Sequence, residues 1–187
     1  MHELSIVKIK LNFKIKIRVE IHKIKMALRY KIAIIGDGGV GKSSLLSRIL
    51  ENTFSPRYAA TLGADVHTLV LHTNYGDIIF DCWDTAGQEK FAGLGEGYWV
   101  NSEGAIAMFD VSSRKSHNNL QEFVNKYKTV AINTPIVICG NKIELNREVQ
   151  PSAKYVDISV KNNYNCITPF VELAIKLTGH LDLKFHF

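Results

Sequence analysis

The chain has 187 residues, 46% of them hydrophobic, which is the length of one domain with enough apolar residues to bury a substantial core. No stretch approaches the roughly 20 apolar residues of a membrane span, and the N-terminus lacks the uninterrupted apolar core of a signal peptide. The formal net charge is +5, and residues 1–26 account for all of it with seven basic and two acidic residues. The remainder is formally neutral, which argues against a nucleic-acid-binding surface spread over the whole fold.

The first 26 residues follow a strand period, because apolar and polar residues alternate strictly from Val7 to Ile21. Three interpretations stay open: a basic arm for nucleic acid or acidic partners, an extra edge strand, or a segment that is not made because Met26 begins a domain that looks complete without it. Phe13 is the only aromatic ring among these lysines, so the signal is generic charge and we expect no nucleic-acid partner. We divide the chain into an extension, 1–26, and one domain, 27–187.

After Met26, short apolar runs rich in Val and Ile alternate with longer helical stretches, which predicts an α/β fold with a parallel sheet covered by crossover helices. A hairpin is expected to turn at Asn74–Asp77, where Asn and Gly suit the turn. The predicted strands are Tyr30–Gly36, Ala64–Leu71, Ile78–Trp83, Ala105–Asp110, Pro135–Asn141 and Tyr155–Ser159, and the predicted helices are Lys42–Glu51, Gly93–Val100, Ser116–Ala131 and Pro169–Thr178.

The run after the first predicted strand fits the pattern GxxxxGK[ST] and leads into a helix, which is the context that a phosphate-binding loop requires. Glycines there let backbone N–H groups turn toward phosphate oxygens, and the helix N-terminus adds its positive dipole end. Lys42 is expected to reach the terminal phosphates and Ser43 to hold Mg²⁺. The nucleotide-binding residues predicted here are Gly36, Asp37, Gly38, Gly39, Val40, Gly41, Lys42, Ser43 and Ser44.

The segment Asp84–Glu89 directly follows another predicted strand, so Asp84 is expected beside the phosphate loop. A carboxylate there can hold Mg²⁺ through water, Gly87 can offer its N–H to the γ-phosphate, and Gln88 can orient the attacking water.

Two later strand ends carry residues suited to a guanine base. In an open parallel sheet they fall along the carboxyl edge, where ligands bind. A carboxylate at Glu144 can accept from N1–H and the exocyclic amine of guanine, whereas adenine presents the opposite polarity. The residues predicted to contact the base are Asn141, Lys142, Glu144, Ser159, Val160 and Lys161. The interval from Asn141 to Tyr155 is close to the minimum for a parallel crossover, so a full covering helix barely fits.

Cysteine placement predicts buried thiols in a reducing compartment, because Cys82, Cys139 and Cys166 form no CxxC pair and the first two lie in apolar runs. No cysteine lies near Phe187 to carry a prenyl group, so we expect a soluble intracellular protein without a permanent membrane anchor.

With these motifs in place, the chain resembles the Ras-like small GTPases, and among them the Ran family, from about Lys31 to Phe187. The resemblance implies a P-loop NTPase small G domain, α/β, with a six-stranded mostly parallel sheet, one antiparallel edge strand and helices on both faces. The segments that carry it are Tyr58–Gly63, Val66–His67, His72–Asn74, Trp83–Phe91, Met108–Val111 and Asn162–Asn165.

The resemblance also implies a function: a switch that binds GTP or GDP with Mg²⁺ and hydrolyses GTP slowly, in nucleocytoplasmic transport. Lys42, Tyr58 and Gln88 would be catalytic, with Tyr58 beside Gln88 when an activating protein docks, and Thr61 would join Ser43 and Asp84 at Mg²⁺. The implied partners are transport receptors, a GTPase-activating protein and a nucleotide exchange factor. A monomer in nucleus and cytoplasm is expected.

Four departures from the family pattern bear on these expectations. Glu144 stands where an aspartate is usual, so we expect weaker guanine binding, and Val160 stands where an alanine is usual, with a small effect. The short crossover after Asn141 stands where the family carries a basic helix that contacts receptors, so we expect that helix to be missing, and we also expect the family's acidic C-terminal tail to be missing after Phe187. These departures motivate an alternative, a degenerate binding module that holds nucleotide poorly and competes for transport receptors.

Overall fold

The computed structural model describes residues 27–57, 59–85, 95–149 and 154–186. Their strands form one sheet in the order β6-β5-β4-β1-β3-β2-β7. These strands are β1 (Leu28–Gly36), β2 (Ala64–Thr73), β3 (Gly76–Thr85), β4 (Gly104–Asp110), β5 (Ile136–Asn141), β6 (Val156–Asp157) and β7 (Phe185–His186). The helices are α2 (Lys42–Glu51), α3 (Gly95–Trp99), α4 (Arg114–Val130) and α5 (Thr168–Thr178). In this part of the chain no helix is long and apolar enough to cross a membrane.

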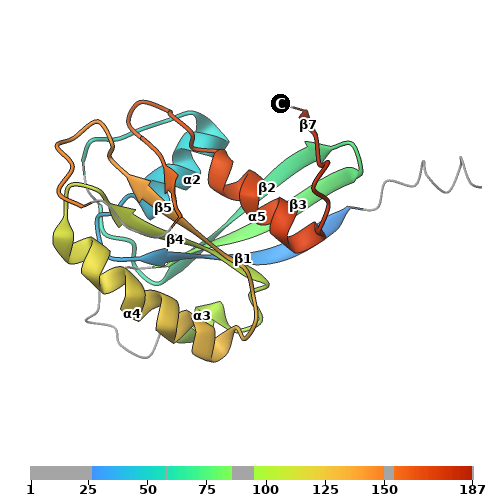
Figure 1. Cartoon of the computed structure of the whole chain (residues 1–187), viewed down its shortest axis with the longest axis horizontal. Helices are drawn as coiled ribbons and strands as arrows, with labels where there is room; N and C mark the ends of the chain where they lie inside the picture. Colours follow the sequence, from blue (N-terminus) through green and yellow to red (C-terminus); the bar gives the residue numbers. More distant parts are fainter. Residues whose placement is uncertain (1–26, 58, 86–94, 150–153, 187) are drawn as a thin grey trace, which may run out of the picture.

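Helices cover both faces of the sheet, with α2 and α5 on one side and α3 and α4 on the other (Figure 1). Strand β1 shows why the sheet lies between them. Its side chains Ile32 and Ile34 belong to the apolar cluster under α2 and α5, and Ala33 and Ile35 belong to the cluster under α3 and α4. All four are fully buried, as expected for a central parallel strand that is buried on both faces.

The predicted α/β architecture is confirmed, with the correction that the sheet has seven strands and not six. β1, β3, β4, β5 and β6 run parallel, and β2 is antiparallel to β3. The added strand β7 pairs antiparallel with the end of β2, so β7 and not β2 is the last strand on that side of the sheet.

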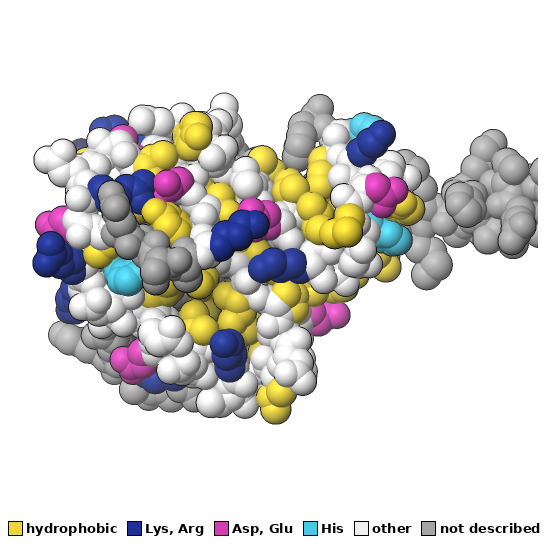
Figure 2. Space-filling view, viewed as in Figure 1, with side chains coloured by type: hydrophobic (Ala, Val, Ile, Leu, Met, Phe, Trp, Pro, Cys, Tyr) yellow, Lys and Arg dark blue, Asp and Glu magenta, His cyan; other side chains and the backbone are white. Residues whose placement is uncertain are grey.

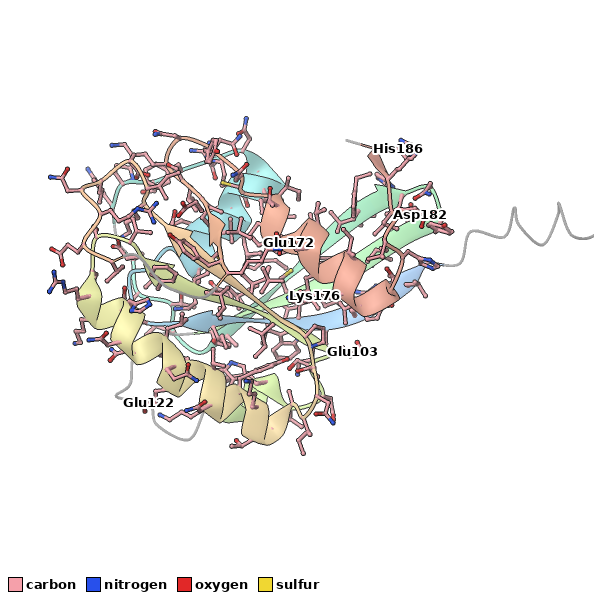
Figure 3. The ribbon with its side chains drawn as sticks, in the orientation of Figure 1. Glu103, Glu122, Glu172, Lys176, Asp182 and His186 are labelled. Carbon is pink, nitrogen blue, oxygen red and sulfur yellow. The ribbon has the colours of Figure 1, made fainter. Side chains whose placement is uncertain are left out.

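Strand β7 is held in place by the β2–β3 hairpin, which turns at Asn74 and Tyr75 as predicted. The backbone N–H of Asn74 donates to the carbonyl of Lys184 at 3.1 Å, and the backbone N–H of Lys184 donates to Asn74 Oδ1 at 2.9 Å. The Tyr75 ring stacks on His180 at 4.2 Å, and its hydroxyl donates to Asp182 at 2.7 Å. Figure 3 places Asp182 and His186 along this end of the hairpin.

The boundaries of the other elements follow from their capping residues. Helix α4 begins before the predicted Ser116, because the Ser113 hydroxyl accepts from the Ser116 N–H and caps the first turn. Helix α5 ends at Gly179, which adopts the left-handed conformation with φ of 71°. The part of the predicted helix Gly93–Val100 that precedes Gly95 lies outside the described residues.

The crossover from β5 to β6 contains no helix in its described residues, 142–149 and 154–155. Ile143 and Val149 from this connection, with Tyr155, pack against the cluster under α4. Figure 2 shows apolar atoms lining a hollow between α5 and α4, with Lys and Arg in small separate groups around it. The connection therefore covers the sheet with loop side chains.

The three cysteines are buried and unpaired, as predicted. Burial raises the pKa of the Cys166 thiol to about 11 and raises that of Cys82 and Cys139 further, so all three stay protonated near neutral pH.

Candidate nucleotide-binding site

The phosphate loop begins where β1 ends and closes where α2 begins, as predicted. Gly36 has φ of 138°, and a Cβ on it would lie 2.2 Å from the Met108 carbonyl oxygen. Gly41 has φ of 102°, and a Cβ there would lie 2.5 Å from Asn141 Nδ2. Only glycine can adopt the left-handed backbone and also fit the small space at these two positions, so the loop conformation depends on both glycines.

Lys42 is the first residue of α2 and is buried, with 6% of its surface exposed. Its Nζ donates to the carbonyls of Gly36 and Asp37, both at 2.9 Å. Burial lowers the pKa of Lys42 to about 8, although the carboxylates of Asp84 and Asp37 act against that shift. The ammonium group therefore lies against the phosphate loop, where phosphate oxygens would satisfy it better than carbonyls.

Three oxygen-bearing side chains predicted to bind Mg²⁺ lie next to Lys42. Ser43 Oγ and Thr61 Oγ1 are 2.9 Å apart, although they come from α2 and from the loop before β2. Asp84 near the end of β3 is buried, and its Oδ1 has no hydrogen-bond partner among the described residues. Burial raises the pKa of Asp84, while the Ser43 hydroxyl and Lys42 lower it.

This donor set fits Mg²⁺. A hard divalent cation takes oxygen ligands and keeps several waters, so two hydroxyls and one carboxylate are an appropriate protein contribution. An unpartnered buried carboxylate oxygen is costly unless something occupies its lone pairs, and a cation or its bound water would do so.

The residues predicted to contact the base meet at the carboxyl ends of β5 and β6. Asn141 Nδ2 donates to the carbonyl of Val40 in the phosphate loop at 2.9 Å, and Asn141 Oδ1 accepts from the Val160 N–H at 3.1 Å. Asn141 thus joins the phosphate loop to the loop after β6. Lys142, with φ of 69°, pairs with Asp110 at 2.6 Å.

Glu144 accepts a hydrogen bond of 2.6 Å from the Ser159 hydroxyl, and the same hydroxyl accepts from the Asn162 N–H at 3.0 Å. The longer carboxylate therefore still reaches the loop that contains Ser159, Val160 and Lys161. Its second oxygen is the acceptor left for a base.

Tyr58, Gly87 and Gln88 lie outside the described residues, and Ser44 lies in the first turn of α2 behind Ser43. All the other predicted residues lie along one edge of the sheet.

Two further residues belong to the site although the sequence patterns did not predict them. Asn119 on α4 donates to Asp37 Oδ2 at 2.8 Å, while Asp37 Oδ1 accepts from the Gly38 N–H at 2.8 Å. No motif marks Asn119. Asp110, the partner of Lys142, ends β4 at the same sheet edge, and that position was a signal that could have identified it.

A protein-family model described as the Ras family matches residues 31–179. The match covers the phosphate loop, Thr61, Asp84 and both loops predicted to contact the base.

Proposed function

The chain belongs to the Ras family of small GTPases, which bind GTP and GDP with Mg²⁺ and hydrolyse GTP, and we propose that within this family it is a Ran-type switch acting in nucleocytoplasmic transport. The observation that carries the switch function is the convergence of Lys42, Ser43, Thr61 and Asp84 at one end of the phosphate loop. The Ran assignment is supported by the sequence segments Tyr58–Gly63, His72–Asn74 and Trp83–Phe91.

In this proposal Lys42 exchanges its bonds to the Gly36 and Asp37 carbonyls for bonds to the terminal phosphates. Ser43, Thr61 and Asp84 hold Mg²⁺, which neutralises charge on the transferring phosphoryl group when bound. Gln88 orients the attacking water, and Tyr58 lies beside it when an activating protein docks. Turnover of the protein alone is slow in this proposal, and an activating partner accelerates it.

The switch itself follows from the residues that contact the last phosphate. Thr61 and Gly87 bind in the triphosphate state and release their loops when the γ-phosphate leaves. The proposed readers of this change are transport receptors, a GTPase-activating protein and an exchange factor, and the proposed location is nucleus and cytoplasm.

One mutation tests the catalytic role directly. Gln88→Leu should retain GTP binding and lose hydrolysis, measured as phosphate release from GTP-loaded protein with and without an activating protein of the Ran family. Loss of GTP binding would show that the switch residues are misassigned. No phosphate release from the unmutated protein under either condition would overturn the hydrolase role.

Receptor binding tests the transport role separately. Gln88→Leu loaded with GTP should bind a nuclear transport receptor, and the same protein loaded with GDP should bind weakly. Equal binding in both states would contradict a nucleotide-controlled switch.

A second candidate is a degenerate binding module that holds nucleotide poorly and competes for receptors. It is favoured by the bond between Glu144 and the Ser159 hydroxyl, which occupies one carboxylate oxygen of the residue expected to read guanine. The nucleotide content after gentle purification separates the two candidates, because stoichiometric GDP or GTP contradicts the module.

A further inference from the structure

Arg48 lies in the second half of α2, six residues after Lys42, and is half-buried. Its guanidinium group reaches across to the loop after β6. Nε donates to the Val160 carbonyl at 3.0 Å and Nη2 donates to the Lys161 carbonyl at 3.2 Å. Nη1 donates to the carbonyl of Asn52, the C-cap of α2, at 3.0 Å. One side chain thus binds two consecutive carbonyls of the base-contacting loop and the end of its own helix.

These bonds connect the phosphate loop to the loop after β6, and that loop back to α2. Asn141 joins the Val40 carbonyl of the phosphate loop to the Val160 N–H, and Arg48 joins the Val160 carbonyl back to α2. Helix α2 itself begins at the phosphate loop. Val160 is 1% exposed. Side chains from two different elements hold its backbone, because Asn141 of β5 accepts from its N–H and Arg48 of α2 donates to its C=O.

The direction of these carbonyls determines the direction of the neighbouring N–H group. In a planar trans peptide the C=O of one residue points opposite to the N–H of the next. Because Arg48 holds the Val160 carbonyl toward α2, the Lys161 N–H points away from α2.

That orientation has a chemical use in base recognition. The N1–H of guanine, which an acceptor such as Glu144 can bind, lies next to the acceptor O6, so the protein must offer a donor beside the carboxylate. A backbone N–H is such a donor, and it would face the amino group of adenine unfavourably.

We propose that Arg48 is a positioning residue for guanine recognition: by holding the carbonyls of Val160 and Lys161 it aims the Lys161 N–H at the base oxygen and couples this loop to the phosphate loop. The inference rests on the base-reading part of the proposed function. Two charge-assisted bonds from a rigid fork suit this task better than one from a flexible ammonium group.

The test compares two nucleotides on three variants. GDP and the diphosphate of 2-aminopurine riboside differ at O6 and, because loss of the carbonyl also removes the proton on N1, at N1–H, so the ratio of their dissociation constants measures recognition of this O6 and N1–H edge of the base. Arg48→Met removes every bond, Arg48→Lys keeps one donor group, and Arg29→Met is the control, since Arg29 also makes two bonds but to Asp81 on β3. Circular dichroism establishes which variants fold.

Arg48→Met should weaken GDP binding about tenfold or more while changing 2-aminopurine nucleotide binding by less than about threefold. Arg48→Lys should lie between, and Arg29→Met should match the unmutated protein. If Arg48→Met does not fold, an intermediate ratio in Arg48→Lys supports the proposal and an unmutated ratio overturns it.

Two other outcomes separate the possible failures. Equal weakening of both nucleotides in Arg48→Met, or no weakening, would overturn the role of Arg48 alone. An unmutated protein that binds both nucleotides equally would overturn the base reading on which the inference rests.

Discussion

Among single residues, Lys42 carries an ionisable group into a buried position. Burial lowers the pKa of Lys42 to about 8. In the nucleotide-free protein the side chain is therefore charged at neutral pH and loses its proton as the pH rises above 8. Phosphate binding requires the charged form. Affinity for nucleotide and stability of the empty protein should therefore respond to alkaline pH in opposite directions.

The affinity of the nucleotide-free protein for GDP should fall about fivefold between pH 8 and pH 9, measured by fluorescence titration. Because the folded pKa is lowered, the folded protein binds fewer protons than the unfolded chain between the two pKa values. The free energy of unfolding without nucleotide should then rise above pH 8, towards the ordinary lysine value of 10.5. Lys42→Met is the control, because its weaker affinity should change only with titration of the base itself. A constant affinity ratio between the two proteins would contradict this account.

Asp84 carries a second prediction at the same scale. Asp84→Asn removes the buried charge but keeps the shape, so affinity for Mg²⁺ should fall about ten- to hundredfold. The measurement is the rate of GDP release as Mg²⁺ is titrated. Asp65 is the matched control, since it pairs with Asp84 across β2 and β3 but is exposed. If Asp65→Asn has an equal effect, the general field of the carboxylates and not coordination explains the loss.

At the scale of elements, the path from β1 into α2 depends on a glycine at its turning point. Gly36→Ala should cost about 2–5 kcal/mol, because the alanine Cβ would meet the Met108 carbonyl of β4 and the left-handed backbone would be strained. Urea unfolding measures this cost. Gly97→Ala in α3 is the control, since a Cβ there meets nothing within 4 Å and alanine favours the helix by up to about 1 kcal/mol. Equal effects of the two substitutions would contradict the steric argument.

The elements also show what sequence patterns can and cannot predict. β1 and α2 were predicted closely, because a strand whose second half is buried and a helix that begins after Gly41 carry strong local signals. β7 was missed because it has two residues and is held by a distant hairpin through Asn74 and Tyr75. Pairing of this kind depends on tertiary contacts and leaves no periodicity in the chain.

The same division holds for the site. The phosphate loop follows β1, and Asp84 and Asn141 lie at the carboxyl ends of β3 and β5. The carboxyl ends of parallel strands meet at one sheet edge whatever the rest of the fold does. Arg48 and Asn119 act from helix positions that face inward only once α2 and α4 are packed, so spacing could not mark them. Glu144 was predicted as a base-reading residue, but its bond to Ser159 depends on how a short crossover folds.

At the scale of the whole molecule, a bound nucleotide should add contacts between the phosphate loop with α2 and the loops after β5 and β6. The phosphate loop and α2 meet the loops after β5 and β6 through Asn141 and Arg48. A bound nucleotide would contact the phosphate loop and the base-contacting loops at the same time. A ligand that binds only the folded state stabilises that state in proportion to the logarithm of the ligand concentration over its Kd.

GDP with Mg²⁺ at about a thousandfold above its Kd should stabilise the fold by about 4 kcal/mol, which is a rise in Tm of about 8–16 °C for a domain of this size. ADP at the same concentration should change Tm little, because it can satisfy the phosphate loop but not the base-contacting side chains. Differential scanning fluorimetry measures both, and removal of Mg²⁺ with a chelator should reduce the GDP shift. If ADP raised Tm as much as GDP, the energetic contribution of Glu144 and its neighbours would be negligible, and binding would be governed by the phosphate loop alone.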